Sequence, residues 1–149
     1  MISYDTYIKG FCDNTYSRYT GNFTSAASTT YLHNGVSMTE YENEPFIIGD
    51  YLHNHIEFMH LSHRRWYTAT DFPFQQRLYG YAAIARPGQV YILGGCCDED
   101  DPIWSTVSLF EKDQWRKIAR LSQGRINHMS ISYGTDIMII GGATHDNRS

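Results

Sequence analysis

The sequence predicts an all-β protein, and three observations favour this class. Short runs rich in β-branched and aromatic residues recur along the chain, separated by clusters of Gly, Asp, Asn and Pro. None of these runs reaches the length of an average helix. Aromatic residues make up 15% of the 149 residues and charged residues only 19%, which argues against a wholly disordered chain. The length suits one domain with a core of ordinary size.

The first 34 residues differ from the rest of the chain. They are rich in Tyr, Thr, Ser and Asn and show neither sustained alternation nor a helical stripe. We expect at most one short strand in 1–34, with loops elsewhere. The stretch 116–121 is the only one for which a helical turn is an alternative prediction to a strand. From residue 35 onward the predicted strands are 36–41, 46–49, 56–61, 65–69, 81–85, 90–95, 106–110, 115–119, 128–133 and 137–142.

The predicted strands repeat along the chain, and several markers keep register through the repeats. Apolar runs that end in Gly49, Gly95 and Gly142 lie 46 and then 47 residues apart. Each is preceded by a strand with small or alternating side chains, and two are followed by a strand with an acidic or hydroxyl residue, such as Glu57. The full set of markers is Gly49, Gly94, Gly95, Gly141, Gly142, Trp66, Trp115, Arg77 and Arg125.

A period of about 50 residues, four short strands and a Gly-Gly end to the second strand resemble the kelch repeat of β-propellers. The resemblance covers roughly 35–149 and implies antiparallel blades at 35–77 and 78–125, followed by a half-blade at 126–149. Kelch propellers usually hold several blades in a closed ring, so an incomplete propeller is expected. An open stack would leave an apolar blade face exposed. Self-association or completion by further blades is therefore expected.

The repeat markers are expected to have structural roles in such a blade. A glycine pair allows close backbone approach and positive φ where the second strand ends. Trp66 and Trp115 are interpreted as anchors packed between neighbouring blades. Arg77 and Arg125 are expected to donate to carbonyls or carboxylates at the blade junctions.

The resemblance implies a non-catalytic protein–protein interaction module. Family partners include cytoskeletal proteins and ubiquitin-ligase substrates. Two alternatives remain open: an extracellular glycan- or matrix-binding propeller, and an oxidase-type propeller enzyme. The sequence contains no Gly-rich phosphate cradle, G-x-S-x-G elbow or spaced carboxylate pair, so no catalytic residue or cofactor is predicted.

Charge and hydropathy patterns narrow the classes of partner. The net charge of −4 and pI near 5.9 give no electrostatic footprint for a nucleic-acid backbone. No apolar run approaches the roughly 20 residues that span a bilayer. The N-terminus lacks a basic start followed by an apolar stretch, so a cytoplasmic protein is expected.

The candidate partner surface lies in the loops that follow the Gly-ending strands, because recognition is often carried by loops on a rigid scaffold. Trp is favoured at binding hot spots, and acidic residues at the rim would steer a basic partner. In the alternative interpretation, Trp104 folds under the blade and the acids only keep an edge soluble. The predicted surface comprises Asp98, Glu99, Asp100, Asp101, Pro102 and Trp104, with Asp50, Tyr51 and His53 from the preceding repeat.

Three other features are interpreted without a functional role. His53, His55, His60 and His63 are expected to be solvated loop histidines, because a strand spreads them apart, and no metal site is predicted. The vicinal cysteines 96 and 97 precede an acidic run that lacks the glycine and terminal Glu of a calcium-binding loop. Asn22 and Asn147 fit the N-glycosylation pattern, which would matter in a secreted protein.

Overall fold

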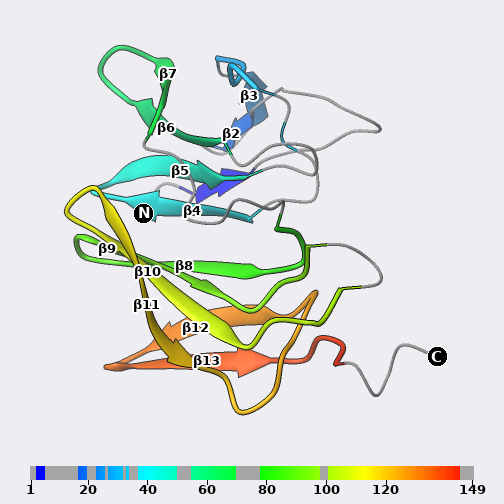
Figure 1. Ribbon diagram of the computed structural model, residues 1–149. Helices are drawn as coiled ribbons and strands as arrows, with labels where there is room; N and C mark the ends of the chain where they lie inside the picture. Colours follow the sequence, from blue (N-terminus) through cyan, green and yellow to red (C-terminus); the bar gives the residue numbers. More distant parts are fainter. Residues whose placement is uncertain are drawn as a thin grey trace.

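A computed structural model shows stacked antiparallel sheets and confirms the predicted all-β class (Figure 1). Its described residues contain thirteen strands and no helix. Consequently, none of them belongs to a helix long and apolar enough to cross a membrane. The structure describes residues 3–5, 17–19, 23–25, 27–31, 33, 37–49, 55–69, 78–97 and 101–144.

Two four-stranded meanders form the body of the molecule, and each pairs its strands in sequence order. The first sheet contains β4 (Ser37–Tyr41), β5 (Glu44–Ile48), β6 (Ile56–His60) and β7 (Arg65–Thr68). The second contains β8 (Ala82–Arg86), β9 (Gln89–Leu93), β10 (Thr106–Glu111) and β11 (Gln114–Arg120). A two-stranded sheet follows, made of β12 (Met129–Tyr133) and β13 (Asp136–Ile140).

Two-residue turns with positive φ close one hairpin in each four-stranded sheet. Glu42 and Asn43 have φ values of 51° and 64° between β4 and β5, and Lys112 and Asp113 have 52° and 57° between β10 and β11. Positive φ at both central residues matches the twist of the flanking strands. Asn and Asp tolerate this region better than most residues, so the local sequence is compatible with tight hairpins.

The N-terminal segment corrects the prediction of at most one short strand in 1–34. It holds a three-stranded meander of β1 (Ser3–Asp5), β2 (Ser17–Tyr19) and β3 (Phe23–Ser25). Three-residue strands are too short for alternation to be recognised in the sequence, although Tyr, Phe and Thr favour extended backbone. Within the described residues these strands pair only with one another, so none of them completes the sheet of β12 and β13.

The core lies between the sheets, because each central strand turns alternate side chains to the preceding and the following sheet. One buried cluster joins the β4–β7 and β8–β11 sheets and contains Phe46, Ile48, Ile56, Leu78, Tyr81, Val90, Ile92, Cys97 and Phe110. On the opposite face of the second sheet, Leu93 and Val107 pack with Ile137 and Ile139 of β13. The strands β4, β8 and β12 consequently lie side by side (Figure 1).

Candidate functional site

One side of the stacked sheets carries the segments that follow β5, β9 and β13, together with the connections that enter β8 and β12 (Figure 1). We call this side the loop face; its described residues are 49, 55, 78–81, 94–97, 101–105, 121–128 and 141–144. Backbone hydrogen bonds tie its segments together. Asn127 N–H donates to the Gly80 carbonyl at 2.7 Å, and Gly95 N–H donates to the Arg125 carbonyl at 2.9 Å. The loop face is therefore a fixed platform rather than a set of independent loops.

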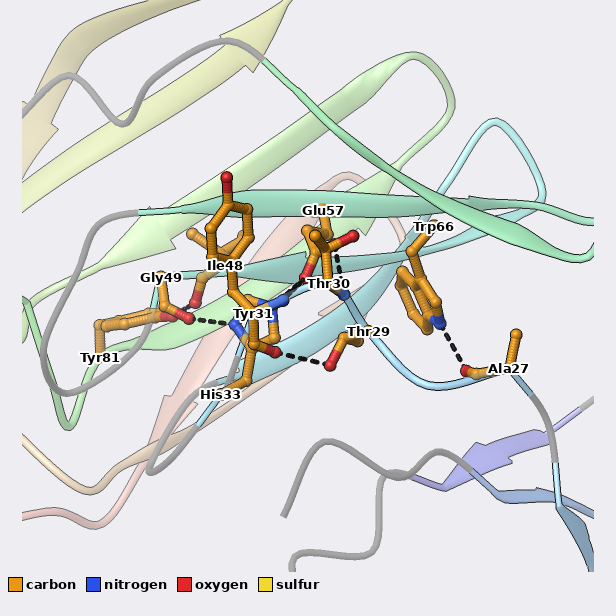
Figure 2. Close-up of polar contacts among 10 residues, drawn as sticks. All are labelled: Ala27, Thr29, Thr30, Tyr31, His33, Ile48, Gly49, Glu57, Trp66 and Tyr81. Carbon is orange, nitrogen blue, oxygen red and sulfur yellow. Dashed lines mark hydrogen bonds and ion pairs between the residues drawn. The ribbon is translucent and has the colours of Figure 1, made fainter. Parts of the chain in front are cut away.

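Two side chains at the same repeat position, Tyr81 just before β8 and His128 just before β12, lie at the junction with the preceding blade. The Tyr81 hydroxyl donates to the Ile48 carbonyl at the end of β5 (Figure 2). His128, 47 residues later, lies with its ring beside Gly94 at the end of β9, and neither ring nitrogen has a hydrogen-bond partner among the described residues. Gly94 leaves room for this contact, since a Cβ there would lie 3.0 Å from the His128 ring and 2.4 Å from a backbone oxygen. The two blade junctions thus place a different polar ring at the same repeat position, and within the described part of the chain only the Tyr81 ring forms a hydrogen bond there.

The imidazole of His128 is buried at the second junction. Burial lowers its pKa below the ordinary 6.5, and the positive charge of Arg125 lowers it further. The nearby backbone of Leu93 acts in the opposite direction but is the weaker influence. A neutral histidine is therefore the form that fits this junction.

A buried carboxylate organises the loop face at the first blade. Glu57 on β6 is fully buried and accepts hydrogen bonds from the N–H groups of Thr30 at 2.9 Å and Tyr31 at 3.1 Å (Figure 2). The His33 Nε2 atom lies 2.7 Å from its Oε2 atom, and His33 Nδ1 lies 2.6 Å from the Gly49 carbonyl oxygen. Burial raises the pKa of Glu57, but the hydrogen bonds from His33, Thr30 and Tyr31 outweigh it and lower the pKa below 4.5. Segment 27–33 is thereby held against the β4–β7 sheet.

His33 occupies the position that a marker arginine holds in the last repeat. Arg125 donates from Nη1 to the Gly141 carbonyl at 2.8 Å, and it precedes Gly141 by 16 residues. His33 precedes Gly49 by the same interval and contacts its carbonyl. Both partners of the His33 ring, the Gly49 carbonyl and the Glu57 carboxylate, are hydrogen-bond acceptors. The same junction is therefore built with an imidazole in one repeat and a guanidinium in another.

The two marker tryptophans lie against neighbouring structure. Trp66 is buried on β7, and its Nε1–H donates to the Ala27 carbonyl at 2.7 Å (Figure 2). Trp115 on β11 lies with its ring centroid 5.0 Å from that of Phe110, at the cluster between the two four-stranded sheets. Trp66 thus secures the N-terminal segment, whereas Trp115 contributes to packing between blades.

The structure brings part of the predicted partner surface to the loop face. Asp101 is partly exposed and Pro102 exposed. Trp104 is half-buried against the core cluster, and its backbone N–H donates to the Gly95 carbonyl at 2.8 Å. The indole therefore supports the loop from beneath. Six residues of the predicted partner surface lie outside the described part of the chain: Asp50, Tyr51, His53, Asp98, Glu99 and Asp100. The marker Arg77 and the glycosylation candidates Asn22 and Asn147 also lie outside it.

The prediction of solvated loop histidines is wrong for His55. Its ring stacks on the Tyr31 ring at a centroid distance of 3.7 Å. His60 and His63 stack on each other at 4.5 Å in the β6–β7 turn. In the described part of the chain, no three His, Cys, Asp or Glu side chains gather as a metal-binding group. The cysteines at 96 and 97 are buried free thiols.

Sequence reasoning missed the junction residues His33, Tyr81 and His128. It recognised Glu57 only as part of a repeated strand. A usable signal was present, because Tyr81 and His128 share a repeat position and His33 shares one with Arg125. The signal was weak because the paired residues differ in type.

Comparisons with known proteins agree with this architecture. The chain is 29% identical to human Kelch-like protein 30 over 87 residues, 56% of the chain, and 28% identical to the mouse Kelch-like protein 30 over 93 residues, 60% of the chain. The repeats of this chain are kelch repeats. The solved structure of YjhT superposes with a TM-score of 0.77 over 89% of this chain at 15% identity, which shows the fold. No protein-family model matches the sequence.

The kelch-repeat chain covers only part of these proteins. It spans 15% of human Kelch-like protein 30, 16% of the mouse protein and 46% of the YjhT chain. The described sheets are antiparallel kelch-type propeller blades.

Proposed function

We propose that this kelch-repeat chain is a non-catalytic module that binds a protein partner through its loop face. The observation that carries the proposal is the set of hydrogen bonds between successive blades, from Asn127 to Gly80 and from Gly95 to Arg125. A surface held in this way loses little conformational freedom when it binds, which favours affinity. The names of the Kelch-like relatives agree with a repeat protein of this kind.

The loop after β9 is the proposed centre of the partner surface. Asp101 and Pro102 lie at its accessible part, while Trp104 fixes the following residues on the core. Carboxylates at the rim of an interface steer encounter with a basic partner more than they add affinity. We therefore propose a partner with a basic surface. Asp98, Glu99 and Asp100 in the same loop, with Asp50, Tyr51 and His53, belong to this proposal.

Quantitative affinity purification with the immobilised chain tests the proposed surface. One variant replaces Asp98, Asp100 and Asp101 with Ser, and a matched control replaces Glu40 and Asp136, acids outside the loop face, with Ser. The loop variant should lower recovery of the specific partners about threefold or more, while the control recovers wild-type amounts. Each variant should keep the wild-type circular dichroism spectrum.

Two results would contradict the proposal. One is unchanged partner recovery with the folded loop variant. The other is an equal decrease with the control, which would indicate a general effect of charge. Trp104→Ala separates support from contact, because loss of a packed indole should destabilise the chain by about 3–5 kcal/mol.

A further inference from the structure

A cavity of about 350 Å³ lies between the β4–β7 and β8–β11 sheets. It lies beside the turn at the end of β4 and the turn at the end of β10, whereas the loop face holds the segments after β5 and β9. The volume falls at the lower end of the range of about 300–1,000 Å³ typical of ligand pockets. Both walls come from described strands. The cavity lining is Tyr41, Glu42, Glu44, Phe46, Phe58, Thr68, Ala69, Phe110 and Asp113.

Aromatic rings form the apolar part of this cavity. Tyr41, Phe46 and Phe110 pack as a triad, with ring centroids 5.3–5.6 Å apart. Phe46 and Phe110 are buried at the blade junction, whereas Tyr41 and Phe58 are half-buried. Two of the four rings therefore remain partly accessible to a ligand. Aromatic rings attract a cation placed within about 6 Å of their centroids, which aliphatic side chains do not.

The polar part of the cavity is acidic. Glu42, Glu44 and Asp113 line it, and none of its lining residues is Lys, Arg or His. Glu44 lies 3.5 Å from the His60 ring, but among the described residues neither Glu42 nor Asp113 forms an ion pair. Burial raises the pKa of Tyr41, and the negative charges of Glu42, Asp113 and Glu111 raise it further. The phenol thus experiences a negative local potential.

We propose that this cavity binds the ammonium or guanidinium side chain of a Lys or Arg residue of a protein partner. The proposal rests on the proposed function as an interaction module and adds a second contact outside the loop face. The accessible rings of Tyr41 and Phe58 would contact the aliphatic stem and the cationic head. Glu42 and Asp113, which have exposed positions on two hairpin turns, would accept hydrogen bonds from the charged group.

Titration of the full chain with short peptides tests the inference directly. The probes are acetyl-Gly-Lys-Gly-amide, the corresponding Arg peptide, and a norleucine peptide that keeps the stem but lacks the charge. Tetramethylammonium chloride serves as a small organic cation. Changes in the NMR signals of the Ala69 methyl group and of the Tyr41 and Phe58 rings report occupancy. The Lys and Arg peptides should bind with a Kd on the order of 1 mM, as expected for one side chain.

Substitutions at the rim and the wall then locate the binding. Glu42→Gln combined with Asp113→Asn should weaken the Lys peptide about three- to tenfold, and Asn suits the positive φ at 113. Phe58→Leu keeps an apolar wall and should weaken binding about two- to fivefold through loss of the ring. Asp136→Asn, at the start of β13, is the matched control and should leave the Kd unchanged. If Phe58→Leu does not fold, the charge variant still decides the question.

Several outcomes would overturn the inference. Equal binding of the norleucine peptide would make the cavity a simple apolar groove. Binding of tetramethylammonium alone would assign it to a small organic cation, and an equal effect of Asp136→Asn would indicate bulk electrostatics. Absence of peptide binding, with partner recovery still dependent on loop residues, rejects this inference and retains the proposed function. Peptide binding, with partner recovery that does not depend on the loop-face residues, retains this inference and rejects the proposed loop-face surface.

Discussion

Two strands with the same apolar pattern meet different surroundings in this molecule. Phe46 and Ile48 on β5 point towards the second sheet and are 1% and 0% exposed. Gly49 directly follows β5 and Gly141 directly follows β13. Counted back from these two glycines, the equivalents on β13 are Met138 and Ile140. These two side chains are 44% and 49% exposed. The difference arises from coverage, because β8–β11 lie over β5 and no described residues cover this face of β13.

The open face extends onto β12, where Met129, Ile131 and Tyr133 are also exposed. In the preceding blade, Ile84 occupies the position of Ile131 and is buried against β13. The comparison shows that each blade carries apolar residues for a neighbour on both faces. An exposed face of this kind marks a contact surface, and in repeat arrays stability depends on such neighbour interfaces.

The largest expected contrast is between aromatic residues at the covered junction and on the open face. Phe110→Ala should lower the free energy of unfolding by about 3–5 kcal/mol, because it removes a buried ring that packs on Phe46 and Tyr41. Tyr133→Ala, on the open face, should change it by no more than about 0.5 kcal/mol. Urea denaturation followed by fluorescence measures both values. Similar losses for the two variants would show that the open face is covered in solution.

The second prediction concerns the face of the first blade that segment 27–33 covers. Glu57→Gln should destabilise the chain by about 3 kcal/mol, because an amide cannot accept every hydrogen bond now made by the carboxylate. The matched control is Ser108→Ala at the equivalent position of β10. The Ser108 hydroxyl is buried without a hydrogen-bond partner among described residues, so its removal should be neutral or slightly stabilising. Denaturant midpoints compare the two, and equal effects would contradict the prediction.

Acid should loosen the two junctions at different pH values. The pKa of His128 is lowered from 6.5 in the fold, so the unfolded chain binds more protons and stability decreases as the pH falls below about 6.5. The pKa of Glu57 is lowered from 4.5, so its contribution is full above about pH 4.5 and is lost as the pH falls through the folded-state value. His128→Tyr places the residue type of Tyr81 at this position. It should remove the loss of stability below about pH 6.5 and keep the loss caused by Glu57. Urea midpoints measured from pH 8 to well below pH 4.5 cover both losses; an unchanged profile in the variant would refute the assignment.

The smallest effect on stability is expected from charging the open face. Met129 and Ile140 are directly paired across β12 and β13, so Met129→Lys with Ile140→Glu introduces an opposite-charge pair. The unfolding free energy should change by about 0.5 kcal/mol or less. Binding of a hydrophobic dye and self-association, measured by light scattering, should both decrease. Ser132→Lys is the control on the same strand, and an equal decrease there would assign the effect to added surface charge rather than to loss of the apolar face.

Most of the strand pattern could be predicted because it depends on local periodicity. The strand predicted at 36–41 corresponds to β4, and the stretch at 115–119 lies within β11 rather than forming the competing helical turn. The three-residue strands of the N-terminal meander escaped recognition because too few residues alternate to establish a period. Their pairing depends on neighbours that the local sequence does not specify.

The polar contacts of the candidate site were less predictable than the strands. Glu57 meets backbone groups 26 and 27 residues earlier, and no local pattern connects the two segments. Tyr81 and His128 occupy the same repeat position, but a phenol and an imidazole have no common sequence signature. Repeat register identified the positions, whereas their chemistry required the three-dimensional arrangement.

The contact between Phe46 and Phe110 has a consequence for synthesis of the chain. The two rings pack together although they are 64 residues apart in the sequence. A ribosome adding about 5–20 residues per second needs roughly 3–13 s to reach the second ring after making the first. During that interval the apolar face of the first blade is present without its cover. Chaperone dependence of the nascent chain should therefore begin once the first blade has emerged and decline once β10 has emerged.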